Sequence, residues 1–247
     1  MEKKRLLVLA TGGRGENEGA SGLQILHEAI RANPPILENT EIVAVVSKYQ
    51  GGGAETKADR FLIPFEQMIP PFTAEKYQAL VKKYDADHVT CSGWVDYVCG
   101  LDPRDTTNIH PGPTRSFGEL GFYGKSVHKA VLEAYKRGEI IQTFVTMHFV
   151  IEDPEDGTDR KKGYDKGPEF FARPVIVRED DTVDILAKRV NTVEHAFQPF
   201  ILNFVLQGKI IYRESEDGKN KRVAMTSDVF KILKPFLPNP EKIQLVS

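Results

Sequence analysis

The stretch that decides the fold is RLLVLATGGRGENEGASG, residues 5–22. RLLVLA at 5–10 contains an unbroken apolar run, which predicts a central parallel strand buried on both faces. A glycine-rich loop follows, and residues 23–33 then carry apolar side chains at helical spacing. A second apolar run, EIVAVVS at 41–47, completes a strand–loop–helix–strand unit with a right-handed connection. This beginning predicts an α/β fold.

The rest of the chain continues the alternation and predicts one Rossmann-like α/β domain over residues 1–247, with its core at about 5–225. We expect a mostly parallel sheet flanked by helices, followed by an antiparallel C-terminal hairpin. The further expected strands are 87–94, 106–111, 142–152 and 170–178, and the hairpin consists of 209–214 and 222–226. The expected helices are 73–85, 126–139 and 182–208, the last with a kink or junction at Pro199. Residues 51–72 are expected to be rich in loops, and residues 236–247 to form a tail.

Composition narrows the class of protein. The 247 residues include 33 Lys plus Arg against 35 Asp plus Glu, a net charge of -2 that does not favour nucleic acid as the main partner. It still allows a local basic pocket for a phosphorylated small molecule. No stretch approaches a membrane span, and LLVLA is too short for a signal-peptide core. Cys91 and Cys99 do not suggest a disulfide framework, so we expect a cytoplasmic protein.

The glycine-rich loop is the first candidate for chemistry. Backbone N–H groups between a strand and a helix N-terminus bind anions, and Gly12, Gly13 and Gly22 allow a ligand to approach the backbone closely. The loop lacks the Gly-Lys-Ser/Thr of a P-loop, and the dinucleotide pattern fails because Gly19 comes one residue late. We expect a phosphate-bearing ligand here; a plain flexible loop is the alternative.

The segment NIHPG at 108–112 is the second candidate. Asn108 and His110 alternate on an expected strand, so both side chains face one site near the strand end. An amide can donate to a developing oxyanion, and an imidazole can donate or relay a proton. Taken alone, the pair is also typical of an asparagine that holds a loop beside a half-buried histidine.

Two further positions carry weaker signals. Asp165 precedes Gly167 and Pro168, so it can be an ordinary turn residue. Glu194 and the following histidine lie in an expected helix, where a histidine is usually packed. No H-E-x-x-H or C-x-x-C spacing occurs, and we expect no metal.

Taken in order, these segments resemble the folate-dependent formyltransferase family. The resemblance rests on the strand–glycine loop–helix start and on SGW (92–94), NIHPG (108–112), TMHFV (146–150), DKGP (165–168), PVIV (174–177), DDTVDILAKRV (180–190) and VEHAFQP (193–199). It runs from about residue 5 to residue 225. It is closest to the branch that formylates glycinamide ribonucleotide in purine biosynthesis, a single-domain enzyme of similar length.

The resemblance implies direct transfer of a formyl group from 10-formyltetrahydrofolate to an amine, without a metal. Carried over to this chain, Asn108 donates to the oxyanion, His110 acts as an imidazolium and relays a proton, and Asp165 keeps His110 charged and oriented. The implied partners are folate and a phosphorylated amine. The contacts to the amine substrate fall on Gly12, Gly13, Ala20, Ser21, Gly22 and Glu194; those to the folate fall on Trp94, Val95, Asp96, Tyr97, Val98 and Tyr164.

The chain departs from the family at several positions, which keeps other family activities open. The first glycine loop is longer than usual, and Asp96 stands where a basic residue is common. The loop before Asp165 is also longer and carries Arg160, Lys161 and Lys162, as a lid would. The alternatives are a formyltransferase for another phosphorylated or sugar amine, a formyltetrahydrofolate deformylase, and a ligand-binding protein without catalysis. The sequence permits a homodimer and requires none.

Overall fold

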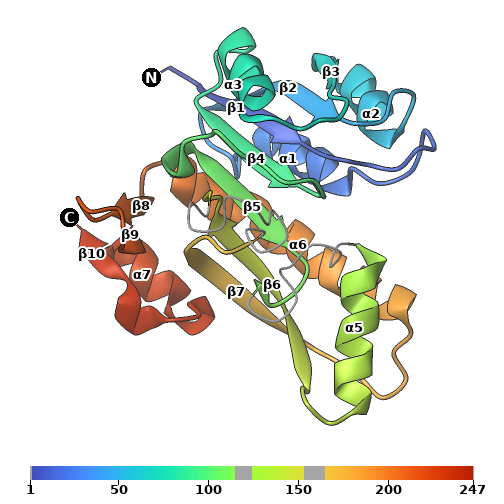
Figure 1. The fold of residues 1–247 in the computed structure, drawn as a ribbon, viewed down its shortest axis with the longest axis vertical. Coiled ribbons are helices and arrows are strands. Elements are labelled where there is room, and N and C mark those ends of the chain that lie inside the picture. Colours follow the sequence, from blue (N-terminus) through green and yellow to red (C-terminus); the bar gives the residue numbers. More distant parts are fainter. Residues whose placement is uncertain (1, 115–123, 153–164, 247) are drawn as a thin grey trace.

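The structure, a computed structural model, describes residues 2–114, 124–152 and 165–246. Its elements form a layered α/β molecule with a small second sheet near the C-terminus (Figure 1). The strands are β1 (Lys4–Leu9), β2 (Thr40–Ser47), β3 (Phe65–Gln67), β4 (His88–Ser92), β5 (Thr106–His110), β6 (Gln142–Phe149), β7 (Glu169–Ile176), β8 (Ile210–Glu214), β9 (Lys221–Thr226) and β10 (Gln244–Val246). The α-helices are α1 (Ser21–Arg31), α2 (Gly53–Phe61), α3 (Ala74–Lys83), α5 (Lys125–Lys136), α6 (Val183–Leu206) and α7 (Ser227–Leu233).

Seven of the described strands form one sheet in the order β3-β2-β1-β4-β5-β6-β7. The first five run parallel to one another, whereas β6 and β7 are antiparallel to their neighbours. The chain moves outward from β1 to β3 and then returns to β4 on the other side of β1. The strand order therefore reverses between β1 and β4, and α/β sheets place ligands beyond the carboxyl ends of such strands. The mostly parallel α/β sheet predicted from the sequence is confirmed.

The apolar run of β1 is continuous because the strand is buried on both faces. Leu6 and Val8 pack into the cluster shared with α1, α5 and α6, whereas Leu7 and Leu9 pack into the cluster that contains Tyr77 of α3. This is the period of two that side chains follow along a strand. The same alternation operates in β5, where Ile109 belongs to the α6 side, so its neighbours point to the opposite face.

The structure corrects one expectation about local elements and decides another. The segment 51–72, expected as a loop, contains α2 and β3, and the three glycines at 51–53 lead directly into α2. Its prolines lie outside these two elements, so the glycine and proline content masked a short helix. Residues 182–208, predicted as one long helix or as two that meet at Pro199, contain one helix, α6, with Pro199 buried inside it.

The C-terminal hairpin is confirmed and is larger than expected. β8 pairs with β9 in antiparallel register, as residues 209–214 and 222–226 predict. The expected tail at 236–247 includes β10, which adds to β9 as a parallel strand after α7. A parallel neighbour requires a crossover connection, and α7 supplies it.

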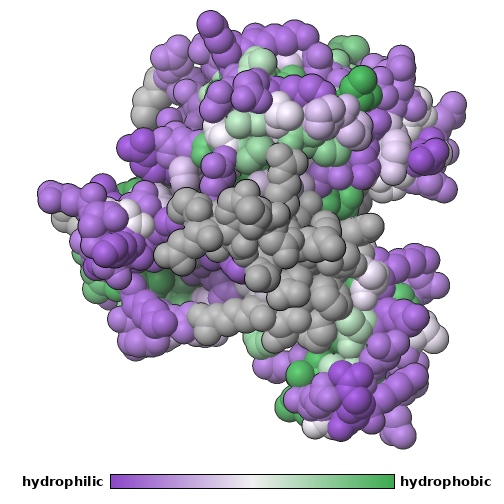
Figure 2. Space-filling view, in the orientation of Figure 1, coloured by the Kyte–Doolittle hydropathy of each residue, from purple (hydrophilic) through white to green (hydrophobic). Residues whose placement is uncertain are grey.

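The surface is mostly polar on the face drawn in Figure 2, where apolar residues form small groups among the described residues. This agrees with a mean hydropathy of -0.34. In the part of the chain that the structure describes, no helix is long and apolar enough to cross a membrane.

Candidate active site

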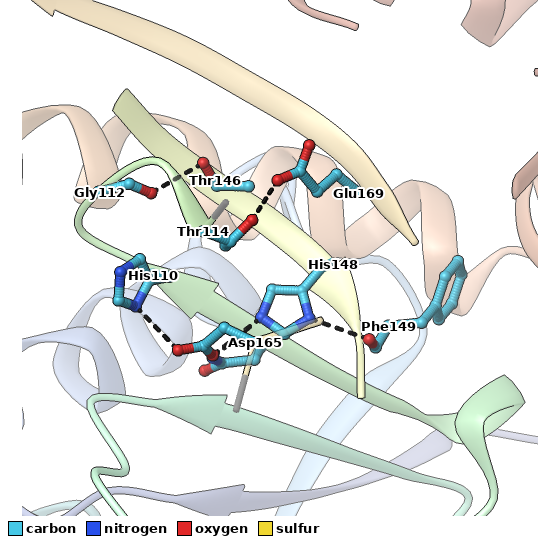
Figure 3. Close-up of polar contacts among 9 residues, drawn as sticks. His110, Gly112, Thr114, Thr146, His148, Phe149, Asp165 and Glu169 are labelled. Carbon is cyan, nitrogen blue, oxygen red and sulfur yellow. Dashed lines mark hydrogen bonds and ion pairs between the residues drawn. The ribbon is translucent and has the colours of Figure 1, made fainter. Parts of the chain in front are cut away.

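Asn108 and His110 of β5 meet Asp165 where β5 ends. The Asn108 amide nitrogen Nδ2 donates to Asp165 Oδ1 at 2.7 Å. The His110 ring nitrogen Nδ1 lies 3.3 Å from Asp165 Oδ2, and Figure 3 shows the ring turned toward that carboxylate. Because Ile109 packs into the core, Asn108 and His110 both point to the other face of the sheet. The structure therefore brings all three predicted catalytic residues together.

The backbone around Asp165 is specialised to bring its carboxylate to this position. Asp165 has φ of 54°, a left-handed conformation that L-residues adopt at a cost and that aspartate tolerates better than most. A Cβ at Gly167 would collide with the carbonyl oxygen of Phe149, so glycine lets the chain pass against the end of β6. The Pro168 carbonyl then accepts from the Phe149 N–H at 3.2 Å. DKGP is thus a turn, as its composition suggests, and its packing on β6 delivers the aspartate.

His148 joins this group, although no role for it was predicted from the sequence. It lies directly opposite Asn108 in the register of β5 and β6. Its Nε2 is 3.1 Å from Asp165 Oδ1, and its Nδ1 faces the carbonyl oxygen of Phe149 at 2.9 Å (Figure 3). Since a carbonyl can only accept, Nδ1 carries a proton. His148 lies in TMHFV, but only the pairing of β5 with β6 shows that it faces Asn108, and no local sequence pattern reveals that pairing.

The charges of this group support one another. Burial alone lowers the pKa of His148, but its hydrogen bond and attraction to Asp165 outweigh burial, and the pKa is raised from its ordinary value. Burial alone raises the pKa of Asp165, but His148, His110 and Asn108 together hold it below its ordinary value. An ionised carboxylate between two imidazoles is the electrostatic state that these shifts favour.

The polar group opens into a cavity of about 680 Å³. Its walls come from the glycine loop, the segment after β4, the end of β5, the start of α5, the end of β6 and one face of α6. Cavities of 300 to 1,000 Å³ with a few convergent polar groups are typical of small-molecule sites. Asn108, His110 and Asp165 all line it, near the reversal of strand order between β1 and β4.

The predicted folate residues that the structure describes form one wall of this cavity. Trp94, Val95, Asp96, Tyr97 and Val98 all line it, and Tyr164 lies outside the described residues. The Trp94 indole N–H donates to the Tyr77 hydroxyl at 3.1 Å, and that hydroxyl donates to the Tyr97 carbonyl at 2.9 Å. The wall is therefore held from behind by Tyr77 of α3. Asp96 forms an ion pair of 2.8 Å with Lys48, a feature of this chain that its sequence did not predict.

The glycine loop forms the opposite end of the cavity. Gly12, Ala20 and Ser21 line the cavity, whereas Gly13 and Gly22 do not. A Cβ at Gly22 would collide with the Ser92 hydroxyl, so this glycine serves the packing of α1 on β4. Ala20 is left-handed, with φ of 52°, and its side chain cannot cap α1. The first N–H groups of α1 are thus available to an anion in the cavity.

Residues 12–19 form an ordered turn held by the start of α2. The Gly13 N–H donates to the Glu18 carbonyl at 2.8 Å, and the Gly53 N–H donates to the Gly13 carbonyl at 3.3 Å. A Cβ at Gly53 would collide with the Glu18 backbone. Lys57 of α2 completes the contact by donating from Nζ to the Gly19 carbonyl at 2.9 Å. Gly52 and Gly53 thus allow two backbones to touch, whereas a Cβ at Gly51 would meet open space.

Glu194 lines the cavity from α6, as predicted for a substrate contact. Burial raises its pKa to about 7, against the opposing effect of a hydrogen bond from Asn191. His195, treated in the sequence as a packed residue, instead reaches the first residue of α1: its Nε2 lies 2.9 Å from the Ser21 hydroxyl oxygen. The glycine loop and the start of α1 form the end of the cavity that is here called the anion end. About one turn of α6 therefore brings three polar side chains to it, those of Asn191, Glu194 and His195.

His128 of α5 is a further polar group at the cavity that the sequence did not single out. Burial, and to a lesser extent His110, lowers its pKa to about 4, so the ring is neutral at pH 7. Among the described residues, no group of three or more His, Cys, Asp or Glu side chains could hold a metal ion.

The fold is that of solved phosphoribosylglycinamide formyltransferases, as the sequence motifs predict, although no family model matches the chain. Its curated relatives and structural neighbours include phosphoribosylglycinamide formyltransferases. The chloroplastic enzyme of Arabidopsis thaliana is 28% identical over 222 residues, 86% of this chain and 68% of the relative. That of Vigna unguiculata is 27% identical and covers 87% of this chain and 64% of the relative. The chain thus spans about two thirds of these relatives.

Solved structures agree on the fold. Phosphoribosylglycinamide formyltransferase from Anaplasma phagocytophilum has a TM-score of 0.66 and 23% identity, with complete coverage of both chains. Glycinamide ribonucleotide transformylase 1 from Symbiobacterium toebii has a TM-score of 0.67 and 24% identity over 90% of this chain and 93% of its own. A formyltetrahydrofolate deformylase from Pseudomonas syringae has a TM-score of 0.63 at 19% identity, over 90% of this chain and 65% of its own.

Proposed function

We propose that the protein transfers the formyl group of 10-formyltetrahydrofolate to the amine of glycinamide ribonucleotide in purine biosynthesis. The observation that carries the proposal is the Asp165 carboxylate, which contacts Asn108, His110 and His148 inside one cavity. That cavity also reaches a helix N-terminus suited to a phosphate. The names of the curated relatives support the same reaction.

In the proposed reaction, the amine nitrogen attacks the formyl carbon and negative charge grows on the formyl oxygen. Asn108 donates one amide hydrogen to Asp165, which fixes the amide. His148 Nε2 lies 3.2 Å from the same nitrogen, but when it is protonated it cannot accept, so the second amide hydrogen is left to donate to the oxyanion. His110, held at Nδ1 by Asp165, donates from Nε2 as an imidazolium. Donors held in place before the reaction stabilise a developing charge without reorganisation.

The atoms balance without a covalent enzyme intermediate. A bond forms between the amine nitrogen and the formyl carbon, and the bond between that carbon and N10 of the folate breaks. The amine loses one proton and N10 gains one, with His110 as the relay. Asp165 remains ionised throughout, because the two imidazoles and the Asn108 amide hold its pKa low.

The proposed substrates enter from the two ends of the cavity. The folate lies along the wall of residues 94–98, where Trp94 and Val98 offer apolar surface and the backbone offers hydrogen-bonding groups. The phosphate of the amine lies at the start of α1, near Ala20 and Ser21, and its ribose lies near Glu194. The reacting carbon then lies between them, beside Asn108 and His110.

The testing experiment follows loss of the formyl group from 10-formyltetrahydrofolate by absorbance, with and without glycinamide ribonucleotide. The proposal expects turnover only when that amine is present. Equal turnover without the amine would identify a deformylase. If neither mixture shows turnover but another phosphorylated or sugar amine does, the protein is a formyltransferase with a different acceptor.

The cellular setting belongs to the same proposal. We place the reaction in the cytoplasm, as the cysteine content predicts, although the plant relatives carry a chloroplastic name. Every residue assigned a role comes from one chain, so the proposed chemistry does not depend on a homodimer. Sedimentation at equilibrium measures the assembly directly.

A further inference from the structure

Two residues of α6 converge on one hydroxyl at the start of α1. His195 Nε2 lies 2.9 Å from Ser21 Oγ, and Asn191 Nδ2 lies 3.5 Å from the same oxygen. His195 and Ser21 are 174 positions apart in the sequence, so only the packing of α6 against α1 brings them together. Ser21 and Asn191 also line the cavity. The contact therefore lies at the proposed phosphate end.

The Asn191 contact makes Ser21 Oγ an acceptor, and the tautomer of His195 then decides where the hydroxyl hydrogen points. The Asn191 amide nitrogen has only hydrogens to offer, so at this contact Ser21 Oγ accepts. A hydroxyl has one hydrogen and two lone pairs. If His195 donates its Nε2–H as well, both lone pairs are occupied and the hydroxyl hydrogen is left for a third group.

His195 is able to donate at neutral pH. Burial lowers its pKa, and the nearby Glu28 opposes the shift only in part, so the ring is neutral near pH 7. A neutral imidazole carries one N–H, and the tautomer is set by the partners of the two nitrogens. Protonation in acid would leave Nε2–H in place, so the donor at Ser21 persists on both sides of the ring's titration.

We propose that His195 and Asn191 are positioning residues that orient the Ser21 hydroxyl to donate its hydrogen to the phosphate of the acceptor substrate. The inference rests on the proposed function and deepens it, because it selects a phosphorylated amine over one that lacks an anionic group. Neither residue touches the reacting carbon in this account. They act through Ser21, which adds a charge-assisted hydrogen bond to the N–H groups of α1.

A purely structural role for His195 would have different consequences. α1 and α6 already share the buried apolar core through side chains such as Leu23 and Leu202. α6 is also held to β4 by the hydrogen bond that the Ser92 hydroxyl donates to Gln198 at 3.1 Å. His195 is itself only partly buried. Removal of its ring should therefore leave the fold intact and weaken the binding of one substrate.

The test is a double-mutant cycle on steady-state kinetics with Ser21→Ala, His195→Ala and the double variant. Each single variant should raise the KM for glycinamide ribonucleotide about tenfold, the scale of a lost hydrogen bond to a charged group. The kcat and the KM for the folate should stay within about twofold. The double variant should be no worse than Ser21→Ala, because His195 acts only through that hydroxyl.

Two variants serve as comparisons. His195→Gln retains an N–H donor near the position of Nε2 and should restore most of the affinity. Thr192 lies on the exposed side of the same helix, so Thr192→Ala should match the wild type in kcat and in both KM values. Thermal unfolding of each variant identifies any that fail to fold, and in that event Ser21→Ala and His195→Gln still decide the question.

The proposal is overturned if the effects of Ser21→Ala and His195→Ala multiply, or if His195→Ala lowers kcat and leaves the KM unchanged. The assay of the wild type distinguishes failure of the orienting role from failure of the proposed function. If the wild type does not use glycinamide ribonucleotide, inorganic phosphate becomes the probe, with binding measured by calorimetry. Weaker phosphate binding by His195→Ala would then support the orienting role, and equal binding would refute it.

Discussion

The two ends of the cavity are built in different ways. The catalytic end consists of side chains: Asn108 and His110 on β5, His148 opposite them on β6, and Asp165 from a turn. The anion end consists mainly of backbone, with the loop of residues 12–19 held by the start of α2. The catalytic end therefore depends on which residues are present, and the anion end depends on how closely two backbones can approach.

This contrast predicts that substitutions at the catalytic end change turnover, whereas substitutions at the anion end change the affinity for the acceptor. The largest effect is expected for His110→Ala, which removes both the imidazolium donor and the proton relay. We expect kcat to fall by at least about a hundredfold with little change in either KM. Near-normal turnover by a folded variant would disprove the proposed mechanism.

The second largest effect is expected for Asp165→Asn, which keeps the shape of the side chain and removes its charge. We expect kcat to fall by about a hundredfold. The pH profile of kcat should change as well, because the Asp165 carboxylate lies 3.3 Å from His110 Nδ1 and favours the charged ring that the mechanism uses. Without the carboxylate, that ring becomes neutral at a lower pH, so the alkaline limb of the profile should move toward acid.

The free energy of unfolding should also depend on pH, because Asp165 outweighs burial and raises the pKa of His148 in the folded protein above the ordinary 6.5. The stabilisation that His148 contributes is therefore fully present below pH 6.5. It is lost as the pH rises through the raised value. Chemical denaturation of wild type and Asp165→Asn across this range measures the loss, with Asp217→Asn in the β8–β9 turn as a control. An identical pH dependence in all three proteins would contradict the coupling.

Gly53→Ala is expected to have a smaller effect, on the affinity for the acceptor rather than on turnover. The added methyl group would collide with the backbone of Glu18, so the glycine loop must shift. We expect a loss of about 1–3 kcal/mol in unfolding free energy, typical of overpacking. The KM for the acceptor should rise severalfold with kcat nearly unchanged. A fall in kcat at constant KM would show that the loop does not serve the anion end alone.

The smallest effect is expected from the titration of Glu194, whose pKa of about 7 lies in the working range. Above pH 7 the carboxylate is ionised and accepts hydrogen bonds from substrate hydroxyls more strongly than the acid does. The wild-type KM for the acceptor should therefore fall as the pH rises through 7. Glu194→Gln should lack this component, and the difference between the two curves removes the titration of the substrate itself. Parallel curves would exclude Glu194 as a contact.

The catalytic end could be predicted from the sequence more fully than the anion end. The strand pattern and the NIHPG segment placed Asn108 and His110 on one face, because alternation along a strand is a local rule. β1, α1 and β2 were predicted for the same reason. His148 was missed because its position depends on the register between β5 and β6, which a single sequence does not determine.

The anion end was harder to predict. The glycines at 51–53 indicated a loop, yet two of them, Gly52 and Gly53, allow the start of α2 to touch the backbone of residues 12–19. The contact of His195 with Ser21 joins residues from α1 and α6 through tertiary packing. β10 was missed because a strand of three residues carries too few alternations to be recognised. In the first two cases the determining interaction is between segments distant in sequence.

The central claim, that one cavity passes a formyl group directly between substrates bound at its two ends, is tested by a single-turnover experiment. The enzyme, in excess, is mixed with 10-formyltetrahydrofolate labelled in the formyl group and with glycinamide ribonucleotide. The account predicts that each label lost from the folate appears on the amine, with none released as free formate. Accumulation of labelled formate at the rate of folate consumption would contradict it.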